Sequence, residues 1–168
     1  ITVEEALILA VKEEVRKGLE PKSHVLILFS GDYPWSLENG LRFDALAQSL
    51  DIELREAIRE EAGGSYDVGA GVQVSHYPRE QFLLAVDFGC APDQVERLTG
   101  LVLDAVRRLQ SEGPKPENVT KARESLRRRH ETDLKDNRYW LETLEFLARN
   151  ETDPRALLEF DRQVEALS

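Results

Sequence analysis

The stretch IREEAGGSYDV, residues 58–68, decides the fold because the period of the hydrophobic pattern changes across it. Before it, large apolar residues recur at every fourth position, at Leu46, Leu50, Leu54 and Ile58. That spacing predicts one apolar stripe along a helix. After it, apolar residues alternate with polar residues and glycines up to Ser75, which is the period of a β-strand. Between the two patterns, Gly63 and Gly64 can adopt the left-handed conformation that ends a helix. The sequence therefore predicts a long helix, a glycine turn and a strand.

Two side chains of this stretch are candidates for binding. We expect Arg59 in the last turn of the helix and Tyr66 at the first residue of the strand, where the turn can bring them close together. A guanidinium beside a phenol is rich in donors and can hold a carbonyl oxygen or a carboxylate. From the residues alone the structural explanation is the more frequent one, because arginine suits a helix C-terminus and tyrosine is common in strands.

Length and composition are typical of one globular domain. The chain has 168 residues, of which 41% are hydrophobic and 32% charged, enough for a sizeable core. The formal net charge of −10 disfavours nucleic acid as a partner, and no apolar run reaches membrane-spanning length. The chain begins at Ile1 and contains no methionine, so we expect residues 1–168 to be a single domain cut from a longer protein.

The remaining elements follow from periodicity and breaking residues. Thr2 and Glu5 resemble a capping box that opens a first helix, with Val11 and Val15 on one of its faces. The unbroken apolar run 25–29 predicts a strand covered on both faces. Residues 66–75 and 81–88 are two alternating segments joined by a short loop, which predicts an antiparallel hairpin. Further helices are predicted after Pro92, Pro116, Asn137 and Asp153. This order predicts an α/β (α+β) two-layer fold in which helices cover a small sheet.

Other kinds of site find little support in the sequence. His24, His76 and His130 have no spacing that would form a zinc site, and surface positions explain them better. The single Cys90 has no histidine near it in sequence, and no phosphate-binding loop is present. The strand glycines Gly69 and Gly71 favour close approach of another backbone, so an edge strand there could accept an extended peptide.

One helix is locally basic, with five cationic residues between positions 121 and 129. Acidic residues are interleaved with them, including Glu124 and Glu131. This pattern favours a solvated, ion-paired face over a nucleic-acid stripe.

Several phrases of the chain resemble the C-terminal half of the pitrilysin-type zinc peptidases, the inverted-motif family that includes insulysin and the mitochondrial processing peptidases. The phrases are LREAIREEAGGSYDV at 54–68, EPKS at 20–23, FGCAP at 88–92 and LKDNRYWL at 134–141. The resemblance covers nearly the whole chain and is greatest to the bacterial zinc-protease branch.

The resemblance implies a processing-peptidase-like domain that lacks the metal. In that family the zinc lies in the N-terminal half, on an H-x-x-E-H helix that is absent here. The C-terminal half supplies an arginine and a tyrosine seven residues apart that reach the peptide held at the zinc. Arg59 and Tyr66 have this spacing, and the resemblance implies that they hydrogen-bond the peptide backbone near the scissile carbonyl.

The expected function is therefore substrate binding within a zinc metalloendopeptidase. The fragment itself would hold no cofactor and be inactive alone. An N-terminal peptidase half, in the same chain or a partner subunit, would supply the zinc, and a peptide would be the substrate. The branch suggests the bacterial periplasm. The alternative is a non-catalytic scaffold domain of the same family, and a third class is an unrelated binder that uses Arg59 for an anion or small molecule.

Overall fold

The computed structural model describes residues 11–17, 20–62 and 67–167. Its strands are β1 Ser23–Asp32, β2 Val68–Ser75 and β3 Gln81–Cys90. Its α-helices are α1 Leu37–Ala62, α2 Val95–Glu112, α3 Pro116–Asp133, α4 Asn137–Arg149 and α5 Phe160–Glu165. Two 3₁₀ helices, η1 Pro92–Gln94 and η2 Pro154–Glu159, precede α2 and α5.

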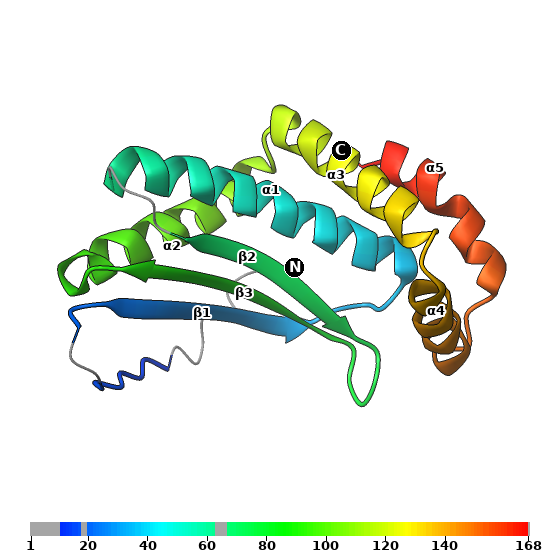
Figure 1. The fold of residues 1–168 in the computed structure, drawn as a ribbon, viewed down its shortest axis with the longest axis horizontal. Helices are drawn as coiled ribbons and strands as arrows, with labels where there is room; N and C mark the ends of the chain where they lie inside the picture. The colour runs from blue at the N-terminus through cyan, green and yellow to red at the C-terminus, as the bar shows by residue number, and fades with distance from the viewer. Residues whose placement is uncertain (1–10, 18–19, 63–66, 168) are drawn as a thin grey trace.

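The three strands form one antiparallel sheet in the order β1-β3-β2. Helices α1 and α2 pack on one face of this sheet, and α3 lies beside α1 (Figure 1). The last helices, α4 and α5, lie beyond one end of the sheet (Figure 1). This arrangement confirms the predicted two-layer fold, with a small sheet that contains an antiparallel hairpin.

The main core lies between the sheet and its two covering helices. Leu54 of α1 and Leu98 of α2 meet Val86 and Phe88 of β3, and all four side chains are 0% exposed. The apolar stripe predicted along α1 accounts for this, since Leu50, Leu54 and Ile58 are all in this cluster. The alternation of side chains along β3 places Val86 and Phe88 on the same face of the sheet, toward the helices. Ile58 of α1 and Val68 of β2 both belong to this core, so the helix and the strand that follows it share one core.

The predicted burial of the first strand was wrong. Residues of β1 alternate, and Leu26 and Leu28 remain 57% and 54% exposed on the face opposite to the helices. The apolar run resembled a strand covered on both sides, but the described helices cover only one face of the sheet.

A side-chain cap stabilises the start of α1, whereas the helix predicted at the start of the chain is not found in the described residues. Ser36 Oγ accepts a hydrogen bond of 3.0 Å from the backbone N–H of Asn39, which satisfies one free donor of the first turn. Residues 11–17 form no helix, and Val11 and Val15 are exposed there. The proposed capping box at residues 2–5 lies outside the described residues.

Buried charge joins the helices to one another. Glu53 of α1 is only 7% exposed, and Arg108 of α2 donates to it at 2.8 Å. A buried carboxylate needs such a partner, so the pair fixes α1 against α2.

The basic face of α3 is ion-paired as predicted, with Arg127 bonded to Glu165 and Arg128 to Glu124. Within the described ranges, no helix has the length and apolar character needed to cross a membrane.

We expect Leu54→Ala to lower the free energy of unfolding by about 2–5 kcal/mol, because it opens a cavity where the helix packs on β3. Leu141→Ala is the matched control, because Leu141 on α4 is 70% exposed. It should change stability by less than about 0.5 kcal/mol. Urea unfolding followed by circular dichroism measures both, and equal losses would contradict the assigned core.

Candidate functional site

Arg59 lies in the last turn of α1, where the sequence placed it. Its side chain is exposed, while its neighbour Ile58 is 1% exposed and anchored in the main core. Among the described residues, none forms a hydrogen bond or ion pair with Arg59. The guanidinium is therefore exposed at a helix end that the buried Ile58 holds against the core. Tyr66 lies outside the described residues, so its distance from Arg59 remains a prediction.

Two further charged residues lie on the same side of α1 as Arg59. Asp51 and Arg55 precede it by eight and four residues, and this spacing aligns all three along the helix. Arg55 Nε donates to Asp51 Oδ2 at 2.8 Å, and this hydrogen bond is the main cause of the raised pKa of Arg55. The three residues form a row, which we call the α1 row.

The α1 row runs along the outer edge of the sheet. Asp51 Oδ1 accepts a hydrogen bond of 3.1 Å from the backbone N–H of Ala70 in β2. Strand β2 is an edge strand, because it pairs with β3 on one side only. The Asp51 side chain of α1 is therefore hydrogen-bonded to the main chain of β2 at its free edge.

The hydrogen-bond register shows which groups of β2 point outward. Gly89 N–H donates to Asp67 O at 3.2 Å, so this opposed pair is a hydrogen-bonded one. Hydrogen-bonded pairs alternate along an antiparallel ladder, which makes Gly69, Gly71 and Gln73 the bonded residues of β2. Val68, Ala70, Val72 and Val74 then direct their N–H and C=O groups to the free edge. The bond from Ala70 to Asp51 agrees with this assignment.

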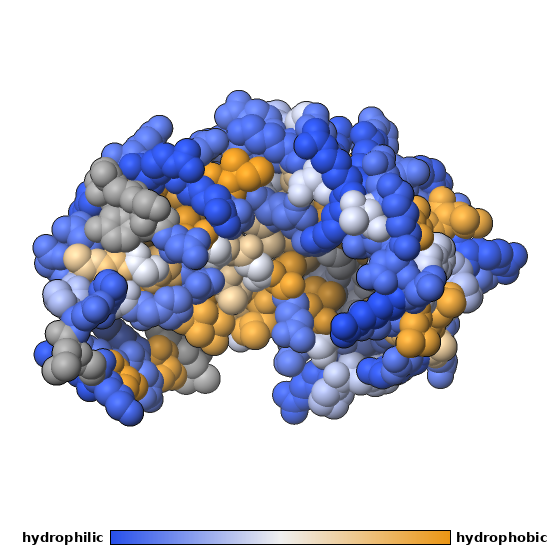
Figure 2. Space-filling view, in the orientation of Figure 1, coloured by the Kyte–Doolittle hydropathy of each residue, from blue (hydrophilic) through white to orange (hydrophobic). Residues whose placement is uncertain are grey.

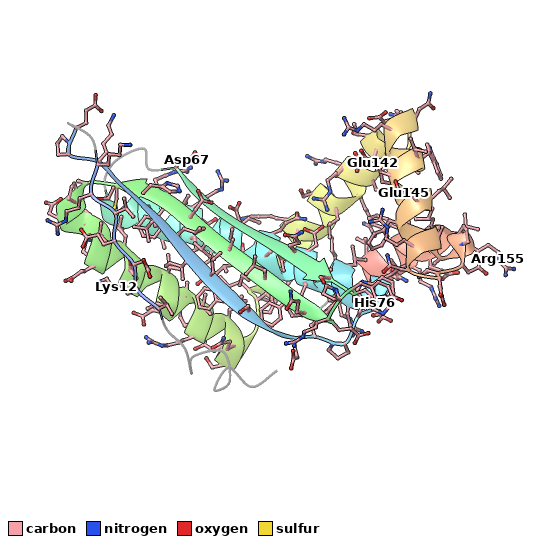
Figure 3. All side chains as sticks on the ribbon, turned by 90° about the horizontal axis from the view of Figure 1, so that it is seen from below. Lys12, Asp67, His76, Glu142, Glu145 and Arg155 are labelled. Atoms are coloured by element: carbon pink, nitrogen blue, oxygen red, sulfur yellow. The ribbon has the colours of Figure 1, made fainter. Side chains whose placement is uncertain are left out.

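A cluster at the opposite end of β2 was not predicted. His76 stacks on Trp35 with ring centroids 4.5 Å apart, and its Nδ1 lies 3.1 Å from Asn150 Oδ1 at the end of α4. Its Nε2 lies 3.3 Å from Glu80 Oε1. Asp67 and His76 mark the two ends of β2 (Figure 3). His76 therefore joins the hairpin to the C-terminal helices, rather than lying on an open surface.

The hydrogen bond from Ala70 to Asp51 and the cluster around His76 were not predicted from the sequence. Asp51 bonds to a residue 19 positions later, and His76 to one 74 positions later. Such long-range contacts depend on packing. The one local signal was the spacing of Asp51, Arg55 and Arg59 on one side of the helix.

The other two histidines and the remaining acidic residues form no metal site in the described part of the chain. His24 lies 3.8 Å from Asp87 on the open sheet face, and His130 stacks on Phe160. Across the described part of the chain, no three His, Cys, Asp or Glu side chains converge as a metal site would require. A hollow of about 590 Å³ beside α3 is lined by that helix alone, including Glu124 and Arg128, which bond to each other.

Comparison with known proteins identifies the family. Residues 5–126 match the family model described as "Peptidase M16 inactive domain". The match spans more than half of the chain, and the chain therefore belongs to this family.

Individual relatives agree with this assignment. The chain is 27% identical over 123 residues to the "Zinc protease PQQL-like" of Arabidopsis thaliana, which covers 67% of the chain and 13% of that relative. It is 33% identical over 96 residues to the "Probable zinc protease PqqL" of Haemophilus influenzae, which covers 55% of the chain and 10% of that relative. The chain thus spans only a small part of the length of these relatives.

Solved structures share the fold. The periplasmic protease PqqL from Escherichia coli superposes with a TM-score of 0.74 at 21% identity, over 89% of this chain and 17% of that one. A peptidase M16 inactive domain from Pseudomonas fluorescens gives a TM-score of 0.70 at 18% identity, over 88% of this chain and 35% of that one. A variant of the ferredoxin protease FusC, solved with Arabidopsis ferredoxin, gives 0.68 at 18% identity, over 88% of this chain and 16% of that one.

Removing the Asp51 carboxylate, which accepts a hydrogen bond from the Ala70 N–H, should destabilise β2 locally. We expect Asp51→Ala to destabilise the chain by about 1 kcal/mol, because the Ala70 N–H loses its acceptor. Hydrogen exchange at Ala70 should also become faster. The control is Asp104→Ala, because Asp104 pairs with Arg107 on an exposed face of α2 and caps no strand. Unchanged exchange at Ala70 in Asp51→Ala would show that the carboxylate does not hold the edge.

Cys90 should react slowly with thiol reagents in the native state. It is 5% exposed, and burial followed by the charge of Asp93 raises the pKa of its thiol. The reactive thiolate is therefore scarce at neutral pH. Because Cys90 is the only cysteine, a coloured disulfide reagent reports it alone. Reaction in urea should be much faster, whereas equally fast reaction of the native chain would contradict the burial.

Proposed function

We propose that this domain binds peptide substrate within a zinc metalloendopeptidase whose metal lies in an N-terminal half outside this chain. Membership of the peptidase M16 inactive-domain family supports a partner half of this kind, and the matched relatives are named zinc proteases. The chain would then be catalytically inactive alone, and the longer protein would be the hydrolase. The periplasmic neighbour from Escherichia coli supports the same compartment for this protein.

The observation that carries the proposal is the position of Arg59. It is exposed at the end of α1, aligned with Asp51, which contacts the free edge of β2. An extended peptide that passes this helix end can offer a backbone carbonyl oxygen to the guanidinium. Tyr66 lies seven residues on, just before β2, and its hydroxyl would be a second donor to the same carbonyl.

The chemical role follows from the charges of peptide hydrolysis. When water attacks a peptide carbonyl, negative charge develops on its oxygen in the transition state. A fixed guanidinium and a phenol stabilise that charge more than they stabilise the neutral substrate. Zinc held in the other half would supply the activated water. Arg59 and Tyr66 would orient the peptide and support the oxyanion.

A scaffold role is the second candidate, supported by the family description as an inactive domain. The longer sequence separates the two functions. An intact H-x-x-E-H helix upstream supports the peptidase, and its absence supports the scaffold.

In the full-length protein we expect Arg59→Ala to lower peptide turnover by about 10²-fold, as removal of one oxyanion donor does. Tyr66→Phe should lower turnover in the same direction. Zinc content should stay unchanged in both variants, because neither residue would be a ligand.

Arg107→Ala is the matched control, because Arg107 is an exposed helical arginine that pairs with Asp104 on α2. It should keep normal turnover. Normal turnover in both Arg59→Ala and Tyr66→Phe would overturn the proposed role of the pair. Zinc loss in either variant would also contradict it.

A further inference from the structure

A second feature of the strand edge lies at the far end of β2 from Arg59. There a pocket of about 270 Å³ opens between the start of α1, the end of β2 and the C-terminal helices. Apolar side chains make up most of its wall: Trp35, Leu41, Val74, Phe146, Leu157 and Phe160. Figure 2 shows that the largest group of hydrophobic residues on the face drawn lies in its middle, with smaller hydrophobic groups near the ends.

The charged residues of this wall neutralise each other. Arg129 of α3 donates to Asp44 of α1, and both line the pocket. Trp35 is held in place by its stack on His76, and Asn150 fixes His76 from α4. The pocket is therefore a mostly apolar recess whose two charged residues are paired with each other.

The free strand edge runs directly into this pocket. Val74 is a wall residue, and its N–H and C=O belong to the outward set established by the register. Val72, two residues earlier, also points its N–H and C=O outward. No hydrogen bond within the described part of the chain engages these groups of Val72 and Val74, whereas Asp51 already occupies the Ala70 N–H. The open part of the edge is thus the half next to the pocket.

We propose that an extended peptide pairs with β2 at Val72 and Val74 and places one bulky apolar side chain in this pocket. Main-chain pairing at an edge gives affinity, and a side-chain pocket beside the edge gives selectivity. This inference rests on the proposed function and names the substrate class of that same edge. The peptide would pair with the half of β2 next to the pocket and extend from there toward Arg59.

The size of the pocket fits one side chain. Sites for whole small molecules commonly occupy about 300–1,000 Å³, so about 270 Å³ is small for such a ligand. Alternate side chains of an added strand face the same side of the sheet. A peptide residue near Val74 can therefore direct its side chain toward the helices, where the pocket lies. The net charge of −10 favours a neutral or basic peptide over an acidic one.

The test compares two nine-residue fluorescent peptides with the same lysine- and threonine-containing sequence, one with phenylalanine and one with alanine at the central position. Anisotropy measures their binding to the 168-residue chain. Burial of a phenylalanine side chain contributes about 1.5–3 kcal/mol, so the phenylalanine peptide should bind roughly 10- to 100-fold more tightly. A third peptide, N-methylated at alternate backbone positions, should lose binding because it cannot pair with the edge.

Variants of the chain test whether the peptides bind at the pocket and at the free edge of β2. Ala156→Leu reduces the pocket volume, since Ala156 lines it, and should weaken the phenylalanine peptide at least about 10-fold toward the alanine peptide. Ala148→Leu on an exposed position of α4 is its control. Val72→Pro removes an outward N–H without breaking the ladder and should weaken both peptides.

Leu26→Pro is the control for Val72→Pro, because it alters the other free edge, that of β1. Circular dichroism verifies that each variant folds, and the N-methylated peptide tests the pairing even if a proline variant does not.

The outcomes separate this inference from the proposed function. Equal binding of all three peptides, or weakening by Leu26→Pro as strong as by Val72→Pro, would overturn the inference. If Arg59→Ala still lowers turnover in the full-length protein, the proposed function stands without it. Selective binding that Ala156→Leu removes, together with normal turnover in Arg59→Ala, would support the pocket and refute the role of Arg59.

Discussion

The packing of α1 across the sheet is the constraint on which the other features depend. Leu50, Leu54 and Ile58 hold one side of the helix in the main core, so its rotation about its own axis is fixed. With that side buried, the α1 row is directed to the edge of β2, where Asp51 bonds to Ala70. A helix rotated by a third of a turn would bury charge in the core. The hydrophobic stripe thus positions the polar residues of the candidate site.

The two features proposed to bind a peptide lie towards opposite ends of a single strand. Arg59 lies near the start of β2, and the apolar pocket lies at its end. An eight-residue strand spans roughly 26 Å at the usual rise, which is the length of a short extended peptide. The proposed peptide would therefore have to be extended over several residues. This geometry is compatible with an inactive domain that orients a peptide for a metal held elsewhere.

Local signals predicted most of the fold. The long helix and the hairpin were predicted from neighbours in sequence, and the structure contains both as α1 and as β2 with β3. The burial of β1 was wrong because an apolar run does not reveal whether a second layer covers it. Leu26 and Leu28 look the same in sequence whether or not another part of a longer protein packs there. The site was predicted at Arg59, whereas Asp51 and the pocket depend on contacts between distant segments.

Hydrogen exchange of the β2 amides in the presence of an uncleaved peptide tests the account most directly. Val72 and Val74 have outward N–H groups, so the account predicts that the peptide slows their exchange while Leu26 and Leu28 on the β1 edge stay unchanged. Slower exchange on the β1 edge alone, or no change along β2, would contradict it. Either result would mean that the peptide does not pair with the free edge of β2.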